Sequence, residues 1–318
     1  MSGVLKIKDS AEHSGFAVGI PTHNRPNQLK STLASISRLD PAPNGIFVCD
    51  SSPLEIYEKV IQICNEAEIP TTLIRSNRPS IPFQRNCLIS VMLDVQPSFE
   101  YVLFLDDDTE PDPSYSEKLI EFLKQNPLYG GAAGITQTKA RSRFIDFLGY
   151  IFLVNGKPGN VLLSGVGIPP NRFDLGGTDV EWIFGCSMWR REVLEKFRWN
   201  DSWDGYAAGE DVYFSFCVSR CWKLRVIPSA RIVNSYAEAG RPTSFQLARM
   251  TVSHRWEIAQ LHARSRLLLR ACVTWSVVGE IGFVICLLIV KPARHRILSL
   301  VGFGLGLSDI FRRPSPSQ

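Results

Sequence analysis

The stretch Tyr101-Val102-Leu103-Phe104-Leu105-Asp106-Asp107-Asp108-Thr109-Glu110-Pro111-Asp112 decides the fold of this 318-residue chain. Five apolar or aromatic residues lead directly into three aspartates, and Pro111 and Pro113 prevent the strand from continuing. A run of this length without polar alternation is typical of a strand that is buried on both faces, as in a parallel sheet. The aspartates therefore lie at the carboxyl end of a central strand, which is where open α/β sheets bind ligands.

The three aspartates offer oxygen ligands for a cation. Alternate residues of an extended segment point the same way, so Asp106 and Asp108 are expected to converge while Asp107 faces elsewhere. Carboxylate oxygens suit a hard cation such as Mg²⁺ or Mn²⁺, especially one that also holds substrate phosphates. The alternative is a solvated acidic turn that caps a helix beginning near Ser116. The buried strand before the aspartates favours the cation site.

The first 110 residues alternate between strands and helices. Apolar runs occupy residues 16–20, 46–49, 71–75 and 101–105, and helices are expected over residues 28–37, 54–67 and 84–93. This order predicts a parallel, right-handed, doubly wound sheet. Each strand ends in polar residues, so we expect a crevice along that edge of the sheet. The sequence contains no GxGxxG after the first strand and no GxxxxGK[ST], which excludes the dinucleotide fingerprint and the P-loop.

The middle of the chain carries a second acidic segment. Residues 130–180 are rich in Gly, Pro and Asn and are predicted to be irregular and to form a mobile flap over the crevice. An apolar strand is expected within residues 180–189, and a helix over residues 191–197. Gly209-Glu210-Asp211 then precedes a helix over residues 212–221. Carboxylates also cap helix N-termini, but the aromatic residues and glycines just upstream favour a pocket.

Composition indicates a globular protein whose C-terminal part is basic. Hydrophobic residues make up 45% and charged residues 21%, and the net charge of +4 is too small to indicate a nucleic-acid partner. From residue 264 onward, eight Lys and Arg residues stand against Glu280 and Asp309, a pattern that favours an anionic membrane surface. The eight scattered cysteines predict free thiols in a reducing cytosol. The first 15 residues are polar and resemble no secretory signal.

The apolar residues near the C-terminus allow three arrangements. A helix is expected over residues 245–270, and residues 271–290 are then apolar except for Glu280. This segment could span a membrane, lie in the membrane plane, or pack on the rest of the protein. The flanking basic residues give no orientation bias, and the run 297–307 is too short to return. We expect peripheral membrane contact through residues 264–313.

Four segments resemble, in order and spacing, the family 2 glycosyltransferases of GT-A fold, and the similarity extends over about residues 15–235. The segments are Val18-Gly19-Ile20-Pro21-Thr22-His23-Asn24-Arg25-Pro26, Asp106-Asp107-Asp108, Phe184-Gly185-Cys186-Ser187-Met188 with Arg190-Arg191, and Gly209-Glu210-Asp211. The resemblance implies an α/β, Rossmann-like, doubly wound and mostly parallel sheet in a catalytic domain at residues 15–240. An N-terminal tail (1–14) would precede this domain, and a helical, partly apolar region (241–318) would follow it.

The resemblance also implies a reaction. A sugar would pass from a nucleoside diphosphate sugar, with inversion, to a hydroxyl of a glycan or lipid-linked saccharide at the cytoplasmic face of a membrane. Asp106 and Asp108 would hold Mg²⁺ or Mn²⁺, and Asp211, assisted by Glu210, would be the general base. The implied donor contacts are Pro21, Thr22, Asn24, Arg25, Asp50, Arg85, Asn86, Asp106 and Asp107. The implied sugar pocket comprises Trp182, Gly185, Cys186, Met188 and Gly209.

The sequence departs from the family pattern in two places. Many relatives place a histidine, as a third metal ligand, after the strand that here contains Ile227; this chain has Asn234 in the local segment, so water or the diphosphate could complete the coordination. The Gln-x-x-Arg-Trp motif of processive synthases is missing, which favours addition of a single sugar.

Two other functions stay open at this level. A nucleotidyltransferase would need a Gly-rich basic loop after the first strand, where Pro21–Pro26 stands. A non-catalytic, membrane-associated nucleotide-binding module is the other alternative. The joint presence of Asp106, Asp108 and Asp211 favours an enzyme.

Overall fold

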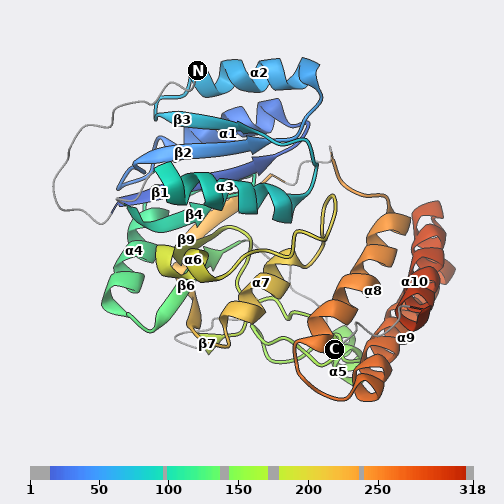
Figure 1. Cartoon of the computed structure of the whole chain (residues 1–318). Coiled ribbons are helices and arrows are strands. Elements are labelled where there is room, and N and C mark those ends of the chain that lie inside the picture. The colour runs from blue at the N-terminus through green and yellow to red at the C-terminus, as the bar shows by residue number, and fades with distance from the viewer. Residues whose placement is uncertain (1–14, 96–98, 137–142, 171–178, 236–239, 313–318) are drawn as a thin grey trace.

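The computed structural model describes residues 15–95, 99–136, 143–170, 179–235 and 240–312 (Figure 1). The expected N-terminal tail, residues 1–14, lies outside the described residues. So do residues 137–142 and 171–178 of the expected flap.

The first half of the chain forms the predicted doubly wound sheet. Its strands are β1 (Gly15–Thr22), β2 (Gly45–Asp50), β3 (Thr71–Arg75) and β4 (Phe99–Phe104). They alternate with helices α1 (Pro26–Ile36), α2 (Leu54–Asn65) and α3 (Ile81–Val95). The four strands are parallel and lie in the order β3-β2-β1-β4, which confirms the predicted fold class.

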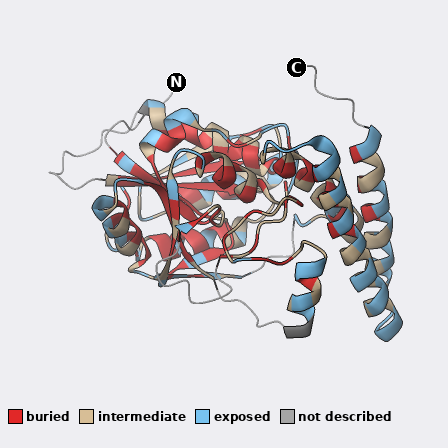
Figure 2. Cartoon of the chain, turned by 90° about the horizontal axis from the view of Figure 1, so that it is seen from below, coloured by how far each residue is buried: buried red, intermediate tan, exposed pale blue. Residues whose placement is uncertain are grey.

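Strand β4 is buried on both faces, as its unbroken apolar sequence predicts. Tyr101, Leu103 and Leu105 belong to the core cluster on the side of the sheet that α1 and α4 (Tyr115–Gln125) cover. Val102 and Phe104 face the opposite way and pack with α3. All five side chains are fully buried, and Figure 2 shows the buried residues running along the strands between the two helix layers.

The sequence predicts residues 130–180 to be irregular, but part of this segment forms regular structure. Strand β6 (Tyr129–Ile135) lies inside the sheet and is buried along almost its whole length, and α5 (Arg143–Ile151) is helical. The glycines of this segment make room for large neighbours: a Cβ at Gly131 would lie 2.5 Å from Cε3 of Trp189, and one at Gly134 would lie 2.4 Å from Cε2 of Tyr115. The prediction was wrong here because glycine needed for close packing has the same sequence signature as glycine in a loop.

The remaining strands complete a mixed sheet. Strand β8 (Ser187–Arg190) is antiparallel and separates β4 from β6, and β9 (Lys223–Asn234) follows β6. Two short strands, β5 (Thr109–Pro111) and β7 (Asp179–Val180), pair with β9. The expected strand within 180–189 is therefore interrupted. Helices α6 (Arg191–Lys196) and α7 (Glu210–Val218) cover the same face as α3.

Three helices form the last described part of the chain, residues 244–312. They are α8 (Ser244–Gln260), α9 (Arg266–Val290) and α10 (Arg294–Arg312), and they pack together beside the sheet (Figure 1). The single helix expected over 245–270 is broken, because Ala263 adopts a left-handed φ of 51° and Ser265 caps the start of α9. Among the described residues, α9 is the one helix long and apolar enough to cross a membrane, and 17% of its most apolar window is buried.

Candidate functional site

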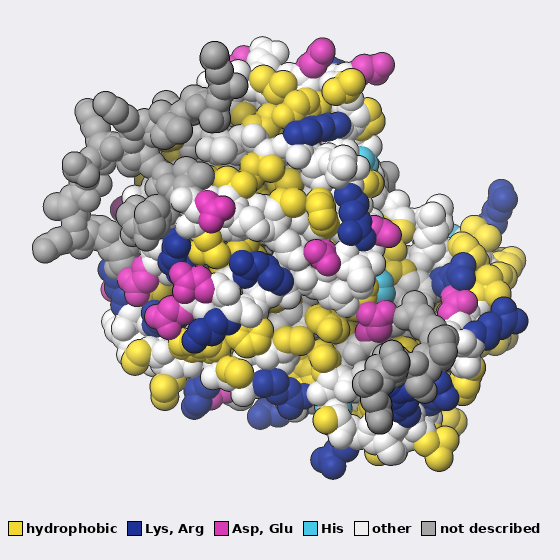
Figure 3. All heavy atoms as spheres, viewed as in Figure 1, with side chains coloured by type: hydrophobic (Ala, Val, Ile, Leu, Met, Phe, Trp, Pro, Cys, Tyr) yellow, Lys and Arg dark blue, Asp and Glu magenta, His cyan; other side chains and the backbone are white. Residues whose placement is uncertain are grey.

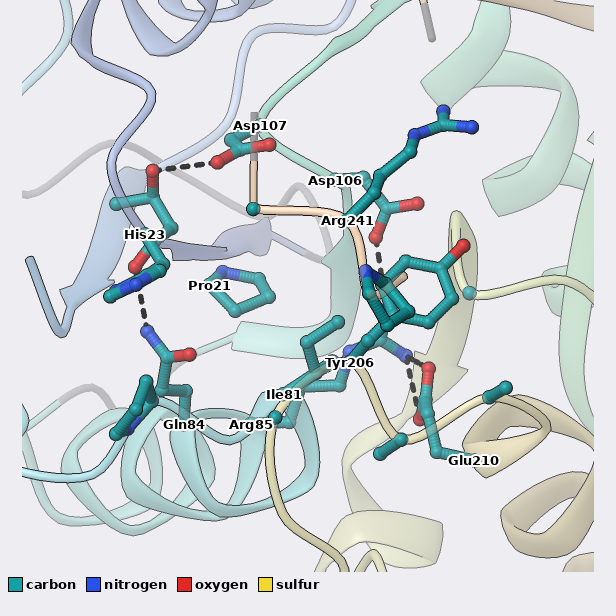
Figure 4. Close-up of a pocket in the computed structure, with 18 of the residues that line it drawn as sticks. Pro21, His23, Ile81, Gln84, Arg85, Asp106, Asp107, Tyr206, Glu210 and Arg241 are labelled. Atoms are coloured by element: carbon teal, nitrogen blue, oxygen red, sulfur yellow. Dashed lines mark hydrogen bonds and ion pairs between the residues drawn. The ribbon is translucent and has the colours of Figure 1, made fainter. Parts of the chain in front are cut away.

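A cavity of about 660 Å³ opens where the strand order reverses, between the carboxyl ends of β1 and β4. Ligands of open α/β sheets bind at such a point. The lining comes from the ends of β1 and β4, the start of α3, the loop 205–209 with the start of α7, and the start of α8. It includes Pro21, Thr22, Arg25, Arg85, Asp106, Asp107, Asp108, Gly185, Gly209, Glu210 and Asp211. In Figure 4, His23, Gln84 and Asp107 stand on one side, and Tyr206, Glu210 and Arg241 on the other.

Asp107 fastens the loop after β4 to the loop after β1. Its carboxylate accepts hydrogen bonds from Thr22 Oγ1 at 2.7 Å and from Arg25 Nη1 at 2.9 Å. Burial raises the pKa of Asp107 to about 6, although Arg25 and Thr22 act in the opposite direction. Asp107 therefore lines the cavity and holds Arg25 there, and Arg25 also lies 3.4 Å from Asp108.

Asp106 and Asp108, which were expected from the sequence to converge on one cation, have different ion-pair partners: Asp106 pairs with Arg85 at 3.2 Å, and Asp108 pairs with Arg25 at 3.4 Å. Both carboxylates line the cavity, and Asn234 lines it as well. Within the described ranges, no group of three His, Cys, Asp or Glu side chains converges on one point. A cation held by Asp106 and Asp108 would thus take its other ligands from water or from a diphosphate, which Mg²⁺ tolerates.

Arg85 is a buried cation that connects the two acidic segments. Its side chain is only 1% exposed, and it lies 3.2 Å from Oδ1 of Asp106 and 3.2 Å from Oε1 of Glu210. Burial disfavours the charged guanidinium, but the carboxylates of Glu210 and Asp106 raise the pKa of Arg85. Gly185 provides the space, because a Cβ at this position would lie 2.7 Å from Nη2 of Arg85.

Glu210 and Asp211 occupy the first turn of α7. The N-cap is Gly209, whose left-handed φ of 87° suits glycine, and no side chain caps the helix. Asp211 Oδ1 accepts a hydrogen bond from its neighbour Val212 N at 2.8 Å. Burial raises the pKa of both carboxyls, and the charge of Arg85 opposes the rise. Two carboxyls that bind protons more tightly than usual thus face the cavity that Asp106 and Asp108 line.

Helix α8 supports the loop that leads to these carboxyls. Met250 Sδ accepts a hydrogen bond from Ala208 N at 3.3 Å, and His254 Nδ1 donates to Ala208 O at 2.9 Å. The His254 ring stacks on Trp203, with a centroid distance of 3.7 Å. Gln246 and Met250 also line the cavity. No sequence motif marks this contribution of α8, because it depends on tertiary contact alone.

Three residues implied as donor contacts point elsewhere. The Asn86 side chain bonds both the N–H and the carbonyl of Trp199, each at 3.0 Å. Asp50 is fully buried and accepts hydrogen bonds from Ser52 and Arg75. Asn24, at a φ of 58°, bonds His23 and is absent from the lining. Asn86 and Asp50 therefore hold backbone near the site in place, and the Asn24 side chain contacts the His23 ring.

Three residues implied for the sugar pocket lie in the core. Trp182 is buried and donates to Ile168 O at 2.9 Å. Cys186 is buried and accepts a hydrogen bond from the Asp106 N–H at 3.5 Å, and Met188 is fully buried in β8. Of the implied set, only Gly185 and Gly209 line the cavity. The register of β8 against β4, which pairs Met188 with Leu103, turns Met188 inward.

Known proteins share this sequence pattern and fold. The sequence model of glycosyl transferase family 2 matches residues 17–198, more than half of the chain. S. aureus TarS (residues 1–349) has a TM-score of 0.52 at 13% identity, over 92% of this chain and 81% of that one. The mannosyltransferase PcManGT from Pyrobaculum calidifontis, in complex with GDP-Man and Mn²⁺, has a TM-score of 0.55 at 14% identity, over 92% and 86%. The comparison with curated proteins finds no match.

At these identities the solved structures show a common fold, and the family match carries the assignment. The fold is the GT-A arrangement, with the acidic end of β4 at the point where the strand order reverses. The chain therefore belongs to glycosyl transferase family 2, and it is a glycosyltransferase.

Proposed function

We propose that this glycosyltransferase moves one sugar from a nucleoside diphosphate sugar to an acceptor hydroxyl, with inversion at the anomeric carbon. The observation that carries the proposal is the meeting of two acidic segments in one cavity. Asp106 and Asp108 come from the end of β4, Glu210 and Asp211 come from the start of α7, and Arg85 lies between them. This arrangement can hold a diphosphate at one end and deprotonate a hydroxyl at the other.

In the proposal Asp211 is the general base. Glu210 is held by Arg85, whereas the hydrogen bond that Asp211 accepts comes from the backbone of its neighbour. The raised pKa of Asp211 makes it a better proton acceptor than an ordinary aspartate. The acceptor oxygen attacks the anomeric carbon as the bond to the diphosphate oxygen breaks, and its proton passes to Asp211. Glu210 keeps Arg85, and through it Asp106, in place.

In the proposal, the donor end of the cavity is the end where Arg25 lies beside Asp107 and Asp108. Arg25 lines it close to Asp107 and Asp108, where it can contact phosphate oxygens. A divalent cation bound by Asp106 and Asp108 would neutralise the charge that grows on the leaving diphosphate. The complex of PcManGT with GDP-Man and Mn²⁺ supports this choice of donor and ion.

The acceptor in this proposal is a glycan or a lipid-linked saccharide, and the enzyme works in the cytoplasm at the cytoplasmic face of a membrane. The support is the position of α8, which lines the cavity and is followed, after the break at Ala263, by the apolar helix α9. We take residues 15–240 as the catalytic domain and 241–318 as a helical region that contributes to its site.

Calorimetric titration tests the donor class. The whole protein is titrated with UDP, GDP, dTDP and CDP, with and without Mn²⁺ or Mg²⁺. We expect one nucleotide to bind tightly only with the metal, and Asp108→Asn to abolish this binding. The matched control is Asp112→Asn, which changes a nearby carboxylate that follows β5 and lies outside the cavity lining. If the folded protein binds none of the four nucleotides with either metal, the proposal fails.

A second experiment separates catalysis from binding. Asp211→Asn should retain the affinity for the metal and nucleotide but lose about 10²–10⁴-fold in transfer, the usual contribution of a general base. Equal transfer rates for Asp211→Asn and the native protein would exclude this role. Metal-dependent nucleotide binding without any sugar turnover in the native protein would favour the non-catalytic alternative.

A further inference from the structure

Helix α9 has one buried side and one exposed apolar side. Leu269, Val273, Ser276 and Val277 are buried in the contact with α8 and α10, and their spacing places them on one side of the helix. Large apolar side chains elsewhere on α9 are exposed: Leu267 (81%), Trp275, Val278, Phe283, Ile289 (78%) and Val290. Exposed apolar side chains that gather in one large patch usually mark a site that binds a protein or a membrane.

Helix α5 extends this apolar surface, although it lies far away in the sequence. Trp275 Nε1 donates to Ile151 O at 2.8 Å, across 124 residues of sequence, and the Trp275 ring stacks on Phe152. Phe147, Tyr150 and Ile151 of α5 are exposed beside this contact. We call the exposed apolar side chains of α5, α9 and α10 the apolar face; on α10 they include Ile297, Val301 and Phe311.

The charges around the apolar face are positive. Exposed Arg264 and Arg266 stand at the start of α9, and exposed Lys291 and Arg294 stand at the turn into α10. The acidic residues of the two helices, Glu280 and Asp309, pair instead with Arg255 and Arg249 of α8. Figure 3 shows yellow apolar and dark blue basic side chains together over these helices at the right-hand edge. An anionic lipid surface is complementary to this pattern.

Contacts with α8 hold α9 from its start to about its middle. Glu280, near the middle of α9, accepts two hydrogen bonds from Arg255 at 2.8 and 2.7 Å. Helix α10 also packs tightly on α8, because a Cβ at Gly302 would lie only 2.4 Å from Phe245 O. If α9 crossed a bilayer, it would have to leave α8, and Glu280 would lose Arg255 and face hydrocarbon. A carboxylate in that position is unfavourable. Moving α8 with α9 instead would disturb the cavity loop that α8 contacts.

We propose that the apolar face docks on an anionic lipid bilayer, with α9 lying in the membrane plane on one leaflet. The basic residues at both ends of α9 would contact the headgroups, and the apolar side chains of α5, α9 and α10 would enter the boundary with the acyl chains. The surface is independent of the donor and of the metal, so it can be tested whether or not the proposed reaction is correct.

Vesicle co-sedimentation of the whole protein tests the docking. We expect binding to vesicles of phosphatidylcholine mixed with phosphatidylglycerol, weaker binding to phosphatidylcholine alone, and a loss of binding as salt rises. Ile289→Glu and Phe147→Glu should each weaken binding about tenfold or more, because each removes an apolar side chain from the membrane boundary. The matched control is Leu54→Glu, which changes an equally exposed leucine (71%) on α2 and should bind as the native protein does.

Three results would overturn the proposal. The first is equal binding of Ile289→Glu, Phe147→Glu and Leu54→Glu to the anionic vesicles. The second is resistance to extraction by alkaline carbonate, which would indicate a spanning helix. The third is a native protein that ignores vesicles but forms a dimer that Ile289→Glu dissociates in light scattering, which would assign the apolar face to a second copy of the chain. Nucleotide titration of each variant shows separately that the catalytic cavity is intact.

Discussion

Replacing Arg85 with methionine should destabilise the protein strongly, because it leaves two carboxylates without their shared cation. Arg85 is 1% exposed, Glu210 10% and Asp106 39%, so most of the lost compensation falls on Glu210. Breaking a buried ion pair by removing one partner typically costs ~3–5 kcal/mol, since the other charge stays buried. With a urea m value of ~3 kcal/mol/M, the unfolding midpoint should fall by about 1 M or more.

The assay is urea unfolding followed both by tryptophan fluorescence and by far-ultraviolet circular dichroism, whose agreement tests two-state behaviour. The matched control is Arg78→Met. Arg78 pairs with Asp204 at 2.6 Å, but Asp204 is 76% exposed, so this loss should cost only ~0–1 kcal/mol. The double variant Arg85→Met/Glu210→Gln removes the stranded charge and should be more stable than Arg85→Met alone. Equal destabilisation by Arg78→Met and Arg85→Met, or a further loss in the double variant, would refute the reasoning.

Three further predictions concern the backbone around the site and one histidine. Gly209→Ala should cost ~1–2 kcal/mol, measured by scanning calorimetry, because a φ of 87° is unfavourable for a residue with a Cβ. Asn86→Leu should lower the free energy of unfolding by ~1–3 kcal/mol yet leave the calorimetric nucleotide affinity unchanged, because its amide holds only the Trp199 backbone. Burial lowers the pKa of His262, whose ring bonds Leu162 O. At a pH near the ordinary histidine pKa of about 6.5, His262 therefore binds more protons in the unfolded chain than in the folded protein. Stability should therefore fall as the pH drops from about 7.5 to about 5.5, and urea unfolding should show a smaller fall in His262→Gln.

The sequence predicts the four parallel strands and the acidic end of β4 because each strand is a short, continuous apolar run that ends in polar residues. Burial on both faces requires such a run, and the order of the strands then follows from the handedness of the connections. The strands therefore depend on local sequence and on general topology. The meeting of residues 106–108 with Glu210 and Asp211 in one cavity was implied by the resemblance to the glycosyltransferase family, because the sheet topology alone does not place the start of α7.

Features that depend on packing between distant residues could not be predicted in the same way. The glycines of β6 look like loop residues until Trp189 and Tyr115 are placed against them. Met188 and Trp182 read as pocket residues, but strand register turns Met188 into the core, and a hydrogen bond to Ile168 fixes Trp182. The break between α8 and α9 rests on one residue with a positive φ, Ala263, where the sequence shows no glycine.

The C-terminal helices belong to the site as well as to the apolar face. The family match ends at residue 198, before the loop that carries Gly209 and the carboxyls of α7. That loop has left-handed backbone at Ala207 and Gly209, and Met250 and His254 of α8 bond Ala208 between these two residues. Such a conformation persists only where surrounding contacts compensate for its cost. Since α8 is also fixed to α9 through Glu280, a membrane that holds α9 would hold the cavity at a defined height above the lipid surface. A soluble acceptor gains nothing from that arrangement, whereas a lipid-linked acceptor would always meet the cavity at the same depth.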